Sequence, residues 1–108
     1  MSKKEILLHR LAFLFLIISI TYLATKGSSI ITSGWDKLDH FFAFFLLYTL
    51  FYYSFLEISN KYKVMMIISL GFTIEIVQSF LPNRSASILD IVADFVGITA
   101  GYIVIAIT

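Results

Sequence analysis

The stretch from residue 88 to residue 108 reads ILDIVADFVGITAGYIVIAIT. Its only charged side chains are those of Asp90 and Asp94, and both fall in its first half. A helix needs about 20 mostly apolar residues to cross the hydrocarbon core of a bilayer, which is roughly 30 Å thick. This stretch is long enough, so we predict a membrane-spanning helix that carries two acidic side chains.

Three other segments of the chain are comparably long and apolar. They cover residues 6–25, 38–56 and 64–81. Together with the last segment they predict an all-α fold, a transmembrane bundle of four helices, and we expect residues 1–108 to form a single domain. The first segment can also be read as a cleavable signal peptide, because Lys3 and Lys4 precede a long uncharged run. An uncleaved first helix is the simpler reading.

The composition excludes several classes of protein. Hydrophobic residues occupy 59% of the 108 positions and charged residues 14%, so a soluble domain would expose large apolar patches. We therefore expect the lipid bilayer as a partner. The absence of cysteine excludes disulfides, thiolate nucleophiles and cysteine metal sites. The formal net charge is +1 and the basic residues are scattered, so we expect no nucleic-acid partner, and we predict no cofactor.

The basic residues also predict an orientation in the membrane. One set lies before the first segment, at its start or between the second and third segments: Lys3, Lys4, Arg10, Lys61 and Lys63. The opposite loops carry a smaller set: Lys26, Lys37 and Arg84. Because cytoplasmic loops are enriched in Lys and Arg, we predict that both termini are cytoplasmic.

On this topology, most of the unusual polar side chains gather at the non-cytoplasmic side. They are Asp36, Lys37, Asp39, His40, Glu75, Gln78, Arg84, Asp90 and Asp94. Glu75 and Gln78 are three residues apart and share a helix face, as do Asp90 and Asp94, which are four apart. The short connection 82–87 makes the third and fourth helices antiparallel neighbours. We therefore predict that these side chains meet in one pocket.

Burying a carboxylate in lipid is costly, so such side chains face the bundle interior or a wet cavity and usually mark a functional site. Each candidate also has a structural reading. Ser87 and Asp90 have the spacing of a helix-capping pair, and His40 could be a hydrogen-bonded structural histidine. Gly97 and Gly101 would let another helix approach closely, either within the bundle or in a homo-oligomer. Lys37 and Arg84 could extend toward lipid phosphates.

Three ordered motifs carry a resemblance to a known family. They are Asp36-Lys37-x-x-His40-Phe41, then Gly71-x-x-x-Glu75-x-x-Gln78, then Arg84 followed by Ser85-Ala86-Ser87-Ile88-Leu89-Asp90 and Gly97-x-x-x-Gly101. In this pattern the chain resembles the VanZ-like family of small bacterial membrane proteins, from Trp35 to Gly101. The family usually has Asn where this chain has Asp94. The resemblance implies a multi-pass protein of the bacterial cytoplasmic membrane, and a founding member associated with low-level teicoplanin resistance.

The function we favour is a site that binds or acts on an anionic, lipid-linked envelope component at the outer leaflet. In a hydrolase or transferase, His40 would be the general base and Glu75 the general acid, with Asp90 as the third catalytic side chain. The remaining side chains of the pocket would bind the ligand, with Lys37 and Arg84 holding its phosphate or carboxylate. These ligand-binding residues are Asp36, Lys37, Gln78, Arg84 and Asp94.

Three alternatives use the same residues. The polar side chains could only lock the helices together in a non-enzymatic accessory protein. Proton-coupled transport would need a polar path to the cytoplasmic side, which the spans hardly offer. A metal could bind His40 with Glu75, Asp90 or Asp94, but a single histidine without cysteine makes an oxygen-rich site, and we assign no metal ligand from the sequence.

Overall fold

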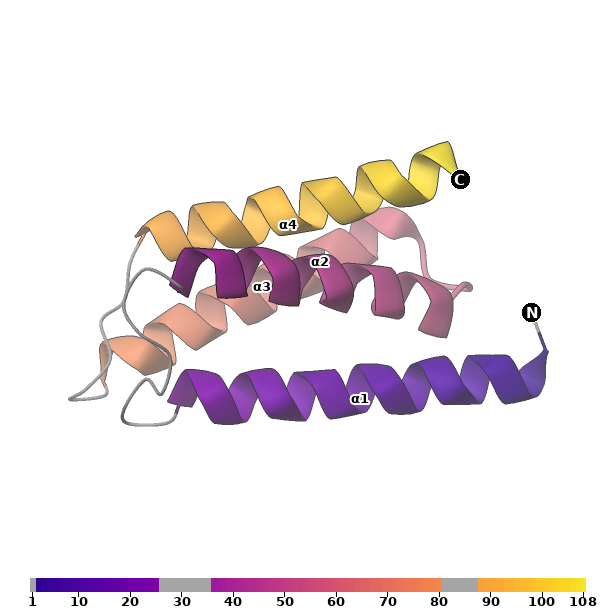
Figure 1. Cartoon of the computed structure of the whole chain (residues 1–108), viewed down its shortest axis with the longest axis horizontal. Helices are drawn as coiled ribbons and strands as arrows, with labels where there is room; N and C mark the ends of the chain where they lie inside the picture. The colour runs from indigo at the N-terminus through magenta and orange to yellow at the C-terminus, as the bar shows by residue number, and fades with distance from the viewer. Residues whose placement is uncertain (1, 26–35, 81–87) are drawn as a thin grey trace.

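The computed structural model describes residues 2–25, 36–80 and 88–108, with only the backbone of 23–25 and 36–37. Four α-helices make up this part of the chain: α1 (Lys3–Thr25), α2 (Asp36–Ser54), α3 (Asn60–Ser79) and α4 (Ile88–Ile107). No strand occurs within those ranges, which confirms the all-α prediction. The helices run side by side, and both chain ends lie at the same end of the bundle (Figure 1). The side of the membrane that these ends face stays a prediction.

Three helices begin earlier than the apolar pattern indicated. α1 begins at Lys3, α2 at Asp36 and α3 at Asn60, whereas apolarity placed their starts at residues 6, 38 and 64. An apolar run marks the part of a helix that can lie in the hydrocarbon core of the bilayer. A polar first turn is not part of that run, so the predicted start falls too late. In α1 that turn is held by a capping box, in which the Glu5 N–H donates to Ser2 Oγ (3.2 Å) and the Ser2 N–H donates to Glu5 Oε1 (3.4 Å).

Three of the four helices are long and apolar enough to cross a membrane. The qualifying stretches are Lys3–Tyr22, Asn60–Ser79 and Ile88–Ile107. The remaining helix, α2, carries several charges in its first turns. It is the central helix, because its contacts with the other three helices are the most extensive. A central helix meets protein more than lipid, so it tolerates a more polar end.

The core is built on one face of α2. Phe44, Leu47, Tyr48 and Phe51 are all buried, and their spacing follows the 3.6-residue period of a helix. Ile67 and Ile74 of α3 and Ile98 of α4 complete the cluster. One face of the Phe-rich helix α2 thus forms the core.

Two glycines allow α4 to lie directly on α2, its most extensive helix contact. A Cβ added at Gly97 would lie 2.4 Å from the backbone oxygen of Phe41. A Cβ at Gly101 would lie 3.2 Å from a ring carbon of Tyr48. The two glycines therefore have the predicted packing role, and they have it between α2 and α4 of the same chain. Because α2 covers both glycines, a homo-oligomer formed through them has no support from this arrangement and stays a prediction.

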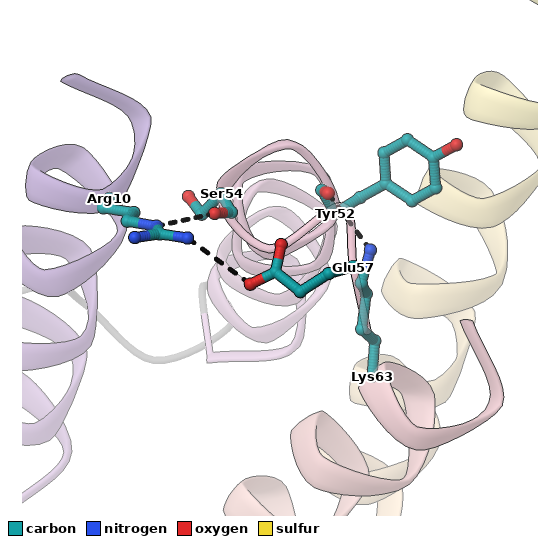
Figure 2. A network of polar contacts seen from close by, with 5 residues as sticks. All are labelled: Arg10, Tyr52, Ser54, Glu57 and Lys63. Carbon is teal, nitrogen blue, oxygen red and sulfur yellow. Dashed lines mark hydrogen bonds and ion pairs between the residues drawn. The ribbon is translucent and has the colours of Figure 1, made fainter. Parts of the chain in front are cut away.

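The other end of α2 is closed by two cations (Figure 2). Lys63 is 1% exposed, and its Nζ donates to the backbone oxygen of Tyr52 (3.1 Å), while Arg10 Nε donates to the oxygen of Ser54 (2.8 Å). The last carbonyls of a helix lack partners within it and favour positive charge, which explains both contacts. Lys63 was expected between the second and third helices, but it lies in the first turn of α3 and its side chain is buried.

Candidate functional site

The candidate site lies at the end of the bundle where α2 and α4 begin and α3 ends (Figure 1). His40 comes from α2, Glu75 from α3, and Asp90 and Asp94 from α4. One nitrogen of His40 and one carboxylate oxygen each of Glu75 and Asp90 lie within 4.8 Å of one another. The structure thus brings together the three side chains that the sequence proposed as catalytic, although their chemical roles stay predictions.

His40 is oriented by two acids on α4. Its Nδ1 lies 2.7 Å from Asp94 Oδ1, and its Nε2 lies 3.7 Å from Asp90 Oδ2. An ionised carboxylate only accepts hydrogen bonds, so with Asp94 ionised the Nδ1–H group of His40 donates the hydrogen bond to Asp94 Oδ1. In the neutral ring this leaves the Nε2 lone pair directed toward Asp90. The distance from Nε2 to Asp90 Oδ2 is too long for a direct hydrogen bond.

The acids of the site are almost fully buried. Glu75 and Asp90 are each 5% exposed and Asp94 is 3% exposed. The His40 side chain, at 14%, is the most accessible part of the group. Within the described ranges, Asp90 Oδ1 and Asp94 Oδ2 have no hydrogen-bond partner, and the only ion pairs that these two acids form are with His40. The site therefore carries several buried acids beside a single imidazole.

The first turn of α4 favours a negative charge on Asp90. This residue is the third of the helix and lies at the positive end of the helix dipole. The start of α2 is at the same end of the bundle and adds a second positive helix end (Figure 1). Both helix starts lower the cost of keeping an ionised carboxylate there.

A glycine on α3 makes space for the carboxylate of Asp94. A Cβ at Gly71 would lie 2.8 Å from Asp94 Oδ2 and 3.2 Å from the Phe44 ring. The Phe44 ring in turn lies nearly parallel to the His40 ring, with centroids 6.4 Å apart. Gly71, one turn before Glu75, is therefore part of the site, a role that the sequence analysis did not assign although the residue stood in its second motif.

The remaining candidates fall into two groups. Gln78 is buried at 2% exposure, one turn after Glu75 on the same face of α3. Asp36 and Lys37 begin α2, but their side chains lie outside the described residues, and Arg84 lies in a segment that is outside them altogether. The predicted cap by Ser87 falls in that same segment. The proposed ligand-binding roles of these residues stay predictions.

The sequence predicts one pocket lined by α2, α3 and α4, with α3 and α4 as antiparallel neighbours because a short connection joins them. The hydrogen bond and ion pairs of the site join α2 to α4, through His40 and its two acids, and Gly71 and Glu75 of α3 lie close to the same side chains. The Gly97 and Gly101 pair is the signal for this pairing, because it marks the α4 face that another helix approaches.

The family model described as VanZ/LLP1 matches residues 3–108. The chain belongs to the VanZ/LLP1 family. A curated relative from fission yeast (Schizosaccharomyces pombe), the uncharacterized protein C11E3.10, is 40% identical over 67 residues. The match covers 57% of this chain and 41% of the relative, so the chain spans about two fifths of that protein. No solved structure matches.

Family membership and three membrane-length helices make this chain a multi-pass membrane protein. The relative comes from a eukaryote, so the predicted location in a bacterial cytoplasmic membrane stays a prediction.

Proposed function

We propose that this VanZ/LLP1 protein binds and acts on a lipid-linked anion, such as a phosphate-bearing component of the cell envelope, at the non-cytoplasmic leaflet. The observation that carries the proposal is the geometry of His40. Asp94 holds one ring nitrogen at 2.7 Å, the other nitrogen faces Asp90, and the His40 side chain is the most accessible of this buried acidic site. A histidine oriented in this way by a carboxylate is suited to act as a general base.

The chemistry proposed is the transfer of a phosphoryl or acyl group of the lipid to water or to a hydroxyl. His40 Nε2 removes the proton from the attacking oxygen, and Glu75 gives a proton to the leaving oxygen. Asp94 positions the imidazole and stabilises its charged form. Lys37 and Arg84 are proposed to hold the anion, together with the positive ends of α2 and α4.

The proposal includes the antibiotic phenotype that the resemblance to VanZ-like proteins implies. In a bacterial host, a protein that alters a lipid-linked envelope component is expected to change tolerance to teicoplanin. This expectation can be tested by expressing the chain in a teicoplanin-susceptible strain and measuring the minimum inhibitory concentration. A rise that is lost with His40→Ala would support it, and an unchanged value with a well-expressed protein would contradict it.

Binding can be measured directly with lipids of defined composition. The purified chain is placed in nanodiscs of phosphatidylcholine with or without phosphatidic acid, a lipid with an exposed phosphate, and the lipids retained by the protein are weighed by native mass spectrometry. We expect retention of phosphatidic acid by the wild type and its loss in His40→Ala. His9→Ala is the matched control, because His9 lies on α1 beside Tyr53 at the opposite end of the bundle. Equal retention of both lipids by the wild type would refute the proposal.

A purely structural role is the second candidate, because the contacts of His40 also tie α2 to α4. Glu75→Gln distinguishes the two. This change keeps the shape and most hydrogen bonds of the side chain but removes the acid. A folded variant that no longer retains or modifies lipid supports the chemical site, whereas an unfolded variant supports the structural role. Glu57→Gln is the control, since Glu57 is exposed in an ion pair with Arg10 at the other end.

A further inference from the structure

We propose that His40 Nε2, a carboxylate oxygen of Glu75 and a carboxylate oxygen of Asp90 form a binding site for one divalent transition-metal ion. The inference does not depend on the proposed lipid chemistry and is an alternative use of the same side chains, because a ring nitrogen that binds a metal cannot also act as a general base. It rests on three features of the described residues: the spacing of the donor atoms, the hydrogen bond that orients His40, and a buried oxygen of Asp90 without a partner.

The spacing of the donor atoms suits an ion between them. Zinc binds histidine nitrogen and carboxylate oxygen at about 2.1 Å, so two ligands in a tetrahedral site lie about 3.4 Å apart. His40 Nε2 and Asp90 Oδ2 are 3.7 Å apart, and one ring nitrogen of His40 lies within 4.8 Å of one carboxylate oxygen each of Glu75 and Asp90. Small rotations of the side chains would bring all three to bonding distance without moving the helices.

The hydrogen bond to Asp94 prepares His40 as a ligand. A histidine that binds a metal through one nitrogen commonly donates its other N–H to a carboxylate, which fixes the ring and raises its basicity. Asp94 Oδ1 accepts from His40 Nδ1 at 2.7 Å, which leaves Nε2 as the free donor atom facing the acids. Asp94 is thus a positioning residue of the site.

The state of Asp90 is an independent indication. The residue is 95% buried, since its exposed fraction is 5%, and its Oδ1 has no hydrogen-bond partner among the described residues. Its other oxygen points to His40. A buried carboxylate without full pairing is costly, and coordination to a cation removes that cost. A divalent ion would also offset most of the negative charge of the neighbouring acids.

The donor set indicates the class of ion. One imidazole and two carboxylates suit zinc or manganese better than calcium or magnesium, which prefer oxygen alone. Three protein ligands leave a fourth position open for water or for a substrate oxygen, as in catalytic zinc sites. No metal ligand was assigned from the sequence, because these acids have one histidine among them and the chain has no cysteine. The distances now give a reason to test it.

The test is calorimetric titration of Zn²⁺ into the purified chain in detergent micelles, after removal of metal by a chelator. We expect one ion per chain for the wild type. His40→Asn and Glu75→Gln should each lower the affinity at least about tenfold, because each removes one of three ligands. His9→Ala should bind as the wild type does, and circular dichroism of each variant establishes that it is folded.

A second readout separates the positioning role of Asp94 from mere structure. With Co²⁺ as the probe, the visible absorption bands report the ligand geometry. Asp94→Asn should keep the helix content, weaken binding about ten- to a hundredfold and shift these bands. The proposal is overturned if the wild type takes up no Zn²⁺ or Co²⁺ at millimolar concentration, or if His9→Ala lowers the affinity as much as His40→Asn. Neither result bears on retention of phosphatidic acid, so the two proposals fail separately.

Discussion

Replacing Gly97 with alanine tests whether the close contact of α2 with α4 holds the site together. The new Cβ would lie 2.4 Å from the backbone oxygen of Phe41 and 3.1 Å from the backbone nitrogen of Phe45. Backbone atoms cannot rotate away, and ordinary van der Waals contact begins at 3.4 Å. The two helices must therefore separate locally by about 1 Å, the difference between that contact and the oxygen distance.

The expected magnitude follows from two opposing terms. Overpacking a tight contact costs about 1–3 kcal/mol, and a clash with fixed backbone belongs at the upper end. Alanine is favoured over glycine within a helix by about 1 kcal/mol. The net loss in the free energy of unfolding for Gly97→Ala is then about 2 kcal/mol. At Gly101 the nearest atom is a ring carbon of Tyr48 at 3.2 Å, so the helix term should offset mild crowding and leave stability nearly unchanged.

The assay is reversible unfolding in mixed micelles with increasing sodium dodecyl sulfate, followed by circular dichroism. A separation of about 1 Å would also carry the 2.7 Å contact between His40 and Asp94 beyond hydrogen-bond distance. Gly97→Ala should therefore lose Zn²⁺ affinity as well as stability, while Gly101→Ala keeps both. If Gly101→Ala were the more destabilising change, the described packing of α4 on α2 would be incorrect.

Four further substitutions test separate contacts. Gly71→Ala places a Cβ 2.8 Å from Asp94 Oδ2, the far end of a side chain that can rotate, so stability should fall by less than about 1 kcal/mol while Zn²⁺ affinity falls in the calorimeter. Arg10→Ala removes a 2.8 Å hydrogen bond and a ring contact and should cost about 1.5–3 kcal/mol in the unfolding assay. Glu57→Ala removes only an exposed ion pair and should cost less than about 1 kcal/mol. Ser2→Ala removes a helix cap, so hydrogen exchange should quicken in the first turn of α1 without a change in binding.

The helices could be predicted because bilayer thickness sets the length of an apolar segment. Bilayer thickness does not determine how far polar residues extend each helix, and it does not determine which helix becomes the central one. Residues 60–63 were expected to precede the third helix, yet they form the first turn of α3, in which the side chain of Lys63 is buried. The central place of α2 was also not predicted, since its Phe-rich sequence suits both a lipid face and a core.

The members of the site could be predicted more fully than their pairing. Counting residues from the helix ends places Glu75 and Asp94 at similar depth but does not say which way each helix is rotated. The similar depth of Glu75 and Asp94 was therefore predicted, whereas the contact of Asp94 with His40 needed the structure. The role of Gly71 was missed for the same reason, because the space it provides depends on an atom of another helix.

One face of α4 serves both packing and chemistry. Asp90, Asp94, Gly97 and Gly101 follow one another at helical spacing, and all four are buried. The glycines bring α2 close enough for His40 to reach Asp94, and the hydrogen bond needs only an acceptor at that position. The asparagine usual in VanZ-like proteins would supply one, so the bundle does not require the extra carboxylate. The charge of Asp94 therefore acts on the imidazole, where it strengthens Nε2 as a base or metal ligand. Asp94→Asn should accordingly lower Zn²⁺ affinity while leaving the unfolding curve in place, and a large loss of stability would show that the carboxylate serves the packing instead.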